Sequence, residues 1–407
     1  MATAHRSSCP KRRRGTISVL AALLLALLLL CVAFAVDMGI LCLVRGQAQV
    51  CADAAALAAA WEMVSDGRIL GEMEDVYDAA RDEAVEYAGR HKVNGDPMAL
   101  DANEGNDPEG EIVFGRLEDP TDRAEEMSYF DPGSYNTVKV RVRCTPGRGN
   151  PVPQFFAKIV GINMGSAAAE AAAYFDDTTT VGFRVTDTTG NASLLPFAVS
   201  QEAWLDLLAG EGSDLWAYDP ETQTVAEGAD ELRELSIFPA GGGGNGNGNG
   251  NGNGNGNGNG SGAITPGNFG TVDIGNPNNA APDLWRQVRE GVSAEDLEYH
   301  GGELRLNEAT GRLKLNGDPG MTVSMQAALS DVVGQARTVL LYSEATGQGN
   351  NTEFTIVGFA GVRIVDYSLT GGDKYILIQP AMVVDDAAIA GSAGTSHFVG
   401  QPVRLVR

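Results

Sequence analysis

The side chains best suited to acid–base or metal chemistry are spread thinly along this chain. The histidines lie far apart, without the His-Glu-x-x-His spacing that holds zinc on one helix face. The sequence also lacks a Gly-x-Ser-x-Gly nucleophile elbow, a Gly-Lys-Ser/Thr phosphate loop and a Cys-x-x-Cys pair. We therefore predict no catalytic site, no metal site, no cofactor and no enzymatic activity. The four histidines, expected at the surface, are His5, His91, His300 and His397.

Closely spaced carboxylates suggest two other kinds of site. Asp176-Asp177 and Asp385-Asp386 could form acid–base pairs, but each pair follows an apolar strand pattern and is most simply a turn. Residues 101–111 alternate oxygen-bearing side chains like a calcium loop. However, Gly105 stands at the fifth, ligand position and Asn106 at the sixth, where the sharp turn needs Gly. We therefore expect the two Asp pairs to lie in turns and residues 101–111 to form a solvated loop.

Residues 241–260 consist of four glycines followed by eight Asn-Gly pairs. Gly241, Gly243 and Gly246 satisfy Gly-x-Gly-x-x-Gly, but no strand and helix flank them, so the match does not indicate a nucleotide site. Such a composition cannot form a core. Strand patterns stand on both sides of the tract, and the family resemblance given below implies that they belong to one C-terminal region. We therefore predict a flexible low-complexity insertion within one C-terminal domain. A linker between two domains is the alternative.

The net charge of −24 is unevenly distributed. The first 15 residues hold five basic side chains and no acid, so the remaining 392 residues carry 24 basic against 53 acidic groups, or −29. An acidic surface of this kind repels phosphate backbones. We therefore predict no nucleic-acid partner, and we also expect no small-molecule substrate.

An apolar run of 21 uncharged residues extends from Thr16 to Val36, long enough to cross a bilayer as a helix. The basic cluster before it predicts a cytoplasmic N-terminus and an exported C-terminal bulk. We expect a basic tail over 1–15 and a transmembrane helix over 16–44. The alternative is a signal peptide cleaved after Ala35, because Ala33-Phe34-Ala35 matches a cleavage motif, although the apolar run continues past it.

Only two of the five cysteines, Cys51 and Cys144, should reach an oxidising compartment, so a disulfide between them is conceivable. Cys31 and Cys42 belong to the apolar run, and Cys9 precedes it.

The sequence patterns beyond the apolar run predict an α+β fold in two exported regions. Val50, Ala54, Leu57, Trp61 and Val64 recur at helical spacing, so a long helix should continue outward from the membrane. Gly67 should end it in a left-handed conformation. Further elements expected in a domain over 46–176 are a helix at 72–90, a strand at 138–142 and a short helix at 151–160. Residues 167–175 are a helix by propensity or a strand by the family resemblance given below, and we expect the strand. A sheet-rich domain should follow over 181–407.

The N-terminal motifs resemble the N-terminus of TadE/TadG-like proteins of Flp (tight-adherence) pilus assembly. The resemblance runs through the basic cluster, the span, Val36-Asp37-Met38-Gly39, Arg45 to Gln49 and the alanine-rich 52–60. Leu20 stands where cleaved pilins carry Glu, and the Asp-x-Ser-x-Ser motif of a von Willebrand A domain is absent. The resemblance therefore implies an uncleaved TadG type without that domain. The residues it assigns to anchoring and packing are Arg12, Arg13, Arg14, Gly15, Val36, Asp37, Gly39, Ala52, Asp53, Ala54, Ala55, Leu57, Ala58 and Ala59.

The function implied by this resemblance is structural. We expect a single-pass protein of the inner (cytoplasmic) membrane that takes part in assembling or anchoring Flp-type pili or a related secretion apparatus. Its partners would be other pilus-assembly or envelope proteins. The alternative is a secreted adhesin or surface structural protein, released by cleavage after Ala35.

Overall fold

The computed structural model describes residues 16–122, 124–238, 267–275, 281–320, 323–347, 351–370 and 374–406. The predicted cytoplasmic tail, with Arg12 to Gly15, and the predicted Gly/Asn insertion lie outside these residues. The described chain is mixed α+β, with one long apolar helix at its N-terminus and a sheet-rich C-terminal part, as expected.

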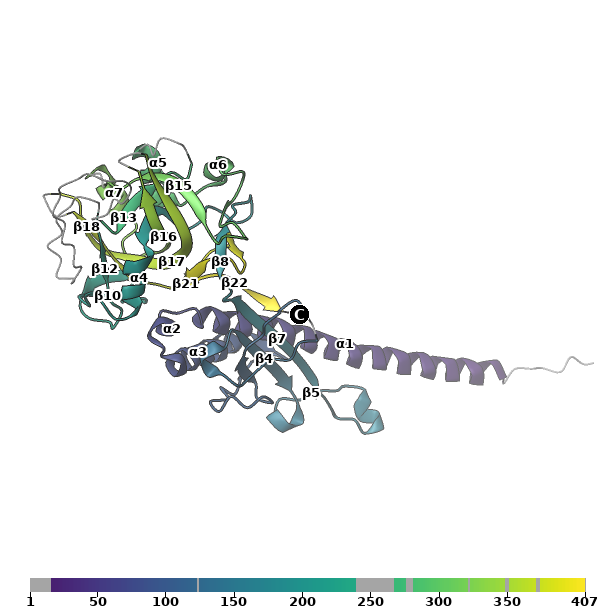
Figure 1. Cartoon of the computed structure of the whole chain (residues 1–407). Coiled ribbons are helices and arrows are strands. Elements are labelled where there is room, and N and C mark those ends of the chain that lie inside the picture. Colours follow the sequence, from purple (N-terminus) through teal and green to yellow (C-terminus); the bar gives the residue numbers. More distant parts are fainter. Residues whose placement is uncertain are drawn as a thin grey trace, which may run out of the picture. The chain divides into compact units, whose positions relative to one another are not determined.

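The first helix, α1 (Thr16–Glu62), runs without interruption for 47 residues (Figure 1). It is long and apolar enough to cross a membrane. Large apolar side chains from Ile17 to Val36 are exposed, whereas burial begins at Asp37 and recurs along one face as far as Met63. The helix therefore has two parts, one with an exposed apolar surface all round and one covered on one side.

The chain divides into two compact units. Unit 1 contains the residues up to Ala56 together with 84–113 and 139–172, and unit 2 contains 57–83, 114–138 and 173–407. Several elements contribute residues to both units: α1, α3 (Met73–Arg90), β3 (Ile112–Gly115), β4 (Thr137–Cys144) and β7 (Ala167–Asp176). This division differs from a simple split of the exported chain near residue 180, and the predicted domain bounds stay a prediction.

Unit 1 is built from short strands beside the covered part of α1. A first hairpin follows α3 and pairs β1 (Lys92–Val93) with β2 (Asp96–Pro97). A second hairpin pairs β5 (Val152–Pro153) with β6 (Met164–Gly165). Within the second hairpin, η3 (Ala157–Val160) is a single 3-10 turn. The alternating valines of β4 are buried and its basic residues half-buried, as the period-two pattern predicts.

Unit 2 is organised around strands that close on themselves. β17 pairs with β15 and β16, β16 pairs with β9, and β9 connects back to β15 through β13. Figure 1 shows these strands curving around one another. Three further strands extend this arrangement: β18 and β21 pair with β17, and β12 pairs with β18. The bounds are β9 (Leu194–Ser200), β12 (Leu235–Ile237), β13 (Phe269–Val272), β15 (Leu313–Asp318), β16 (Ala336–Thr346), β17 (Thr352–Ser368), β18 (Tyr375–Pro380) and β21 (Thr395–His397).

The apolar strand β9 is buried on both faces. Leu195, Phe197 and Val199 pack with side chains of the helices, whereas Leu194 and Ala198 belong to a second core cluster. A strand covered on both sides reads as a continuous apolar run, which explains this segment of the sequence. The helices of the first cluster are α4 (Gln201–Leu208), α5 (Ala281–Glu290) and α7 (Gln326–Ser330), whereas α6 (Ala294–Glu298) contributes Leu297 to the second cluster.

The remaining strands of unit 2 are smaller. β10 (Trp216–Asp219) and β11 (Thr224–Glu227) form a hairpin, and β8 (Thr180–Phe183) lies between β14 (Leu304–Arg305) and β20 (Ala388–Ala390). The C-terminal strand β22 (Val399–Val406) pairs with β19 (Val383–Val384) and continues the sheet beside β7.

The strands on either side of the Gly/Asn tract belong to one sheet. β12 and β13 both lie in the large sheet of unit 2. The Asn268 side chain donates to the Ser236 carbonyl at 2.9 Å and accepts from the Phe238 amide at 2.9 Å, so the segments before and after the tract are bonded to each other. This geometry supports the proposal that the tract is inserted within the C-terminal domain.

The buried face of α1 consists mainly of small residues, whereas Val50 and Trp61 are exposed. Two local predictions were wrong. Gly67 begins α2 (Gly67–Leu70), and the left-handed cap is Gly71, with φ 79°. The predicted helix over 151–160 is strand β5 followed by one 3-10 turn, because the residue before a proline disfavours the helical region, which keeps Val152 extended ahead of Pro153.

Candidate functional site

Asp37 is the only charged residue of α1 before Arg45, and it is the first buried one. Its exposed fraction is 4%, whereas its neighbours Val36 and Met38 are 42% and 43% exposed. A carboxylate removed from water needs hydrogen-bond donors to replace its hydration. The chain must therefore bring polar groups to this point of an otherwise apolar helix.

Three consecutive backbone amides supply those donors. Asp37 Oδ1 accepts from the Phe155 amide at 2.9 Å, and Oδ2 accepts from the Ala157 amide at 2.6 Å. The Phe156 amide donates to both oxygens, at 3.2 and 3.0 Å. These amides precede and begin η3, where a helical turn leaves its first N–H groups without internal partners. Asp37 therefore acts as a capping carboxylate from 118 residues away.

The β5–β6 hairpin holds these amides in place. Val152 pairs with Gly165 and Pro153 with Met164, and Gly161 ends the turn at φ 88°. A Cβ added to Gly165 would lie 2.9 Å from the Leu41 side chain, one helical turn beyond Asp37, so the hairpin approaches α1 closely here. We call residues 155–164 the pinned loop.

Two glutamines of α1 make further contacts in unit 1. Gln47 Oε1 accepts from the Asn94 amide at the β1–β2 turn, at 3.0 Å. Gln49 Nε2 donates to Asp53 Oδ1 at 2.8 Å and to the Glu170 carbonyl of β7 at 3.1 Å. The motif from Arg45 to Gln49 thus binds the helix to the rest of unit 1 through polar contacts.

The structure places the predicted anchoring residues in different environments. Ala52, Ala55 and Ala59 are buried, whereas Asp53, Ala54, Leu57 and Ala58 are half-buried. Val36 and Gly39 are exposed, and a Cβ on Gly39 would meet nothing within 4 Å. Among the predicted residues that the structure describes, Asp37 and Asp53 make polar side-chain contacts. The anchoring and packing roles of the set stay predictions.

Sequence reasoning missed Phe155, Phe156 and Ala157 because they contribute backbone groups, which carry no residue-type signal. One signal was present: a lone Asp in an apolar helix needs partners if it is buried. Nothing in the spacing indicates which segment supplies them.

The two cysteines considered for a disulfide, Cys51 and Cys144, are both buried free thiols in unit 1. The Cys51 thiol lies 3.8 Å from the Ala88 carbonyl oxygen, and burial raises the pKa of Cys144. They therefore behave as small core residues in this structure.

A second carboxylate, Asp66, occupies the break after α1 and binds within unit 2. Its Oδ2 accepts from Arg363 Nη1 at 2.8 Å and its Oδ1 from the Met382 amide at 2.8 Å. Arg363 is 4% exposed, donates through Nε to the Gly334 carbonyl at 3.0 Å, and lies 3.5 Å from the Tyr218 ring centroid. A buried guanidinium is thus fully surrounded by acceptors and an aromatic face.

The loop considered for calcium closes on its own groups. Asn103 Nδ2 donates to the carbonyls of Asp107 and Ile112 at 2.9 and 2.8 Å, and the Asp101 amide donates to Glu111 at 2.9 Å. No cluster of three metal-binding side chains occurs within the ranges that the structure describes.

The basic face of β4 binds its own chain, with Arg141 paired to Glu170 at 2.7 Å.

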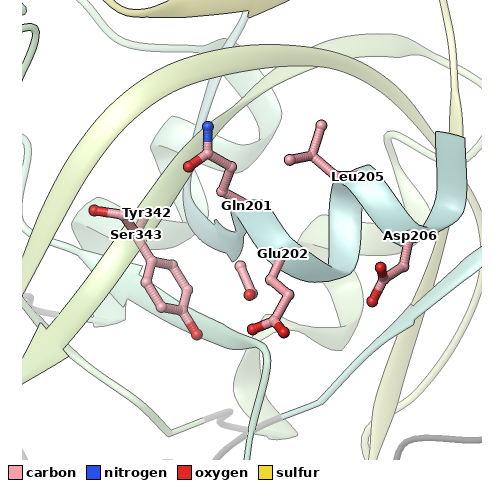
Figure 2. Close-up of a pocket in the computed structure, with 7 residues that line it drawn as sticks. Gln201, Glu202, Leu205, Asp206, Tyr342 and Ser343 are labelled. Atoms are coloured by element: carbon pink, nitrogen blue, oxygen red, sulfur yellow. The ribbon is translucent and has the colours of Figure 1, made fainter. Parts of the chain in front are cut away.

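A pocket of about 320 Å³ in unit 2 lies between α4 and β16 (Figure 2). Figure 2 shows the carboxyl groups of Glu202 and Asp206 on one side of α4, with Gln201 and Leu205 on the other. Burial raises the pKa of Tyr342 to about 12, so its hydroxyl stays protonated at neutral pH. The hydroxyl of Ser200 accepts a hydrogen bond from the Ala203 amide and caps α4. The lining also contains the hydroxyl of Ser343 and the carboxylates of Glu202 and Asp206, and none of the lining residues is His, Lys or Arg.

The three histidines that the structure describes, His91, His300 and His397, are half-buried, whereas His5 lies outside the described residues. Burial lowers the pKa values of His300 and His397, and His91 Nδ1 lies 2.8 Å from the Tyr87 carbonyl oxygen. They lie apart from the pocket lining and from Asp37 in the described contacts.

Comparison with known proteins gives one match. Residues 15–62 match the family model described as "Putative Flp pilus-assembly TadE/G-like". No curated protein and no solved structure matches the chain. The resemblance predicted from the N-terminal motifs is confirmed over this segment, which contains Asp37, both glutamines and the alanine-rich stretch. The match supports a role in Flp pilus assembly.

Proposed function

We propose, from this TadE/G-like segment, that the chain is a non-enzymatic envelope protein anchored by α1. It would take part in assembling or anchoring Flp-type pili or a related secretion apparatus. The observation that carries the proposal is that the family match coincides with a helix whose first part exposes only uncharged, mostly apolar side chains. Soluble proteins rarely expose so large an apolar surface.

The length of that exposed surface fits a bilayer. Residues 17 to 36 are all uncharged, and at 1.5 Å per residue they span about 30 Å, the thickness of a hydrocarbon core. We place the end of the span at Asp37, where burial by the chain begins. The basic tail favours a cytoplasmic N-terminus in the inner membrane, with the bulk exported.

The alanine-rich stretch contributes differently from the exposed span. Ala52, Ala55 and Ala59 are covered by this chain, so they stabilise its own fold. Within the span, Ala22 and Ala26 have the small-xxx-small spacing that allows helices to approach in a membrane. We propose that partner helices bind along this exposed part of α1, and that the exported surfaces contact pilus or envelope proteins.

The alternative is a protein released by cleavage after Ala35. Ala35 is exposed and lies two residues before the Asp37 site, so cleavage would leave that site in the mature chain. The released protein would then be a soluble adhesin or surface component.

Two measurements test the proposal. The mass of the native protein and its distribution after cell breakage distinguish the anchored from the released form. We expect an intact span and extraction from membranes by detergent alone. A soluble protein whose N-terminus is Val36 would support the alternative.

The pilus role is tested separately by deletion of the gene. We expect loss of Flp-type pili, restored by the wild-type chain and not by a chain lacking residues 17–36. Normal piliation in the deletion strain would contradict the pilus role while leaving the membrane anchor in place.

A further inference from the structure

The level at which α1 leaves the lipid is marked by Asp37. Before it, the exposed surface of the helix is uncharged all round, and after it one face is covered by the chain. Any segment bound to Asp37 is therefore held next to the bilayer surface, provided that α1 is the membrane anchor, as proposed above.

The segment bound there is the pinned loop. Four hydrogen bonds from three of its amides fix its first residues to the Asp37 carboxylate. The Gln154 amide donates to the Asn163 carbonyl at 3.1 Å, which closes the loop at its base. The loop thus has a defined position on the helix, and it is short enough for all its side chains to stay near that level.

The pinned loop exposes large apolar side chains. Ile159 is 83% exposed and Phe155 62%, and three more are over 40% exposed. Exposed apolar groups gathered on one short loop indicate a surface that is covered in use. The other three are Phe156, Ile162 and Met164.

The charges around the loop fit the headgroup region of a membrane. Between Asp131 and Glu170 the sequence has no acidic residue, although the exported chain as a whole is strongly acidic. Lys158 stands within the loop itself, 6.0 Å from the Phe155 ring centroid. Aromatic and aliphatic side chains beside a basic residue are typical of segments that lie in the membrane interface.

We infer that the pinned loop is a second membrane contact of this protein. Its apolar side chains enter the leaflet on the exported side of the same bilayer that α1 crosses, and Lys158 faces the lipid phosphates. The anchor thereby has two points of attachment, and Asp37 is the positioning residue that sets the distance between them.

Site-specific photo-crosslinking in the full chain tests this inference. A benzophenone amino acid replaces Ile159 in the protein reconstituted into vesicles of phosphatidylethanolamine and phosphatidylglycerol. Leu27, in the span, is the positive control, and Phe130, which is 98% exposed in unit 2, is the matched control for a water-exposed apolar residue. We expect lipid adducts at 159 and 27, several-fold above those at 130.

Each other outcome has a distinct meaning. Adducts at 27 without adducts at 159 would overturn the second contact and leave the anchor intact. An adduct from 159 to a protein chain would also overturn it, in favour of a protein partner. Absence of lipid adducts at 27 would remove the anchor on which the inference depends.

The positioning role of Asp37 is tested in the same vesicles. In the Asp37→Ala variant, the adduct yield at 159 should fall several-fold while the yield at 27 is unchanged, because the loop loses its attachment to α1. An unchanged yield at 159 would show that Asp37 does not set the loop's position.

Discussion

Two carboxylates hold segments of the chain in different ways in the two units. Asp37 in unit 1 binds three backbone amides, whereas Asp66 in unit 2 binds the buried guanidinium of Arg363. Loss of the first carboxylate leaves neutral donors unsatisfied, and loss of the second leaves a buried charge unpaired. From this comparison we expect the Asp66 contact to stabilise the core of unit 2. We expect the Asp37 contact to stabilise only the loop bound to it, so that the loop can detach while the rest of unit 1 stays folded.

The largest effect is expected from Asp66→Ala. Removal of one partner of a buried ion pair costs about 3–5 kcal/mol, so the free energy of unfolding of unit 2 should fall by that amount. All four tryptophans (Trp61, Trp204, Trp216 and Trp285) lie in unit 2, so tryptophan fluorescence during urea unfolding of the full chain in detergent measures this unit.

The control for this prediction is the double variant Asp66→Ala with Arg363→Met. Replacing both charges should recover part of the loss, because the unpaired guanidinium is gone. A loss below about 1 kcal/mol for Asp66→Ala alone would mean that water solvates Arg363.

A smaller, local effect is expected from Asp37→Ala. Loss of the acceptor for buried amides costs about 1–3 kcal/mol, so hydrogen exchange of the Phe155 to Ala157 amides should accelerate about tenfold to a hundredfold. Exchange followed by mass spectrometry on the full chain measures this. The tryptophan transition of unit 2 should stay unchanged, and a shift in it would break the distinction between the two sites.

Asp37→Asn should give an intermediate result. The amide keeps one acceptor oxygen but loses the charge that strengthens each bond, so the loss should be about 1 kcal/mol. Exchange rates of the same amides should lie between those of the wild type and Asp37→Ala. Rates equal to the alanine variant would show that the charge carries the whole interaction.

The smallest effect is expected in the pH dependence of stability of unit 2. It comes from His300, a basic residue whose neutral form burial favours, in contrast to the charged Arg363. Burial lowers the pKa of His300 below its usual 6.5, an effect that hydrogen bonds with the backbone of Asp273 and Ile274 only partly offset. The unfolded chain binds a proton first, so stability should decline as pH falls from about 6.5 toward the folded pKa. His300→Gln should flatten that decline in tryptophan-monitored urea unfolding, and an unaltered pH profile would contradict the assignment.

Much of the local structure was predictable because its causes are local. The alternating valines of β4 and the apolar run of β9 carry the period and composition of strands, and the length of the apolar run defines the first part of α1. The strand at β7 is alanine-rich and was predicted only through the family resemblance, since propensity alone also allows a helix.

The contacts that build the candidate site were not predictable, for a physical reason. Asp37 binds amides 118 to 120 positions away, and Asp66 binds groups 297 and 316 positions away. Four of these five groups are backbone amides. The buried face of α1 was not predicted either, because the helical spacing of Val50 and Trp61 shows only that they share a face. Which face is covered depends on the segments that pack against the helix, and these are visible only in the fold.

The continuity of α1 has a mechanical consequence. Forty-seven residues in one unbroken helix form a rod about 70 Å long, and the helix continues without a break from its exposed apolar part into the part that the chain covers. Such a rod transmits torque. A neighbouring helix that turned the span about its axis would turn the covered half of α1 through the same angle, and inserting one residue before Asp37 would rotate everything beyond it by about 100° relative to the span.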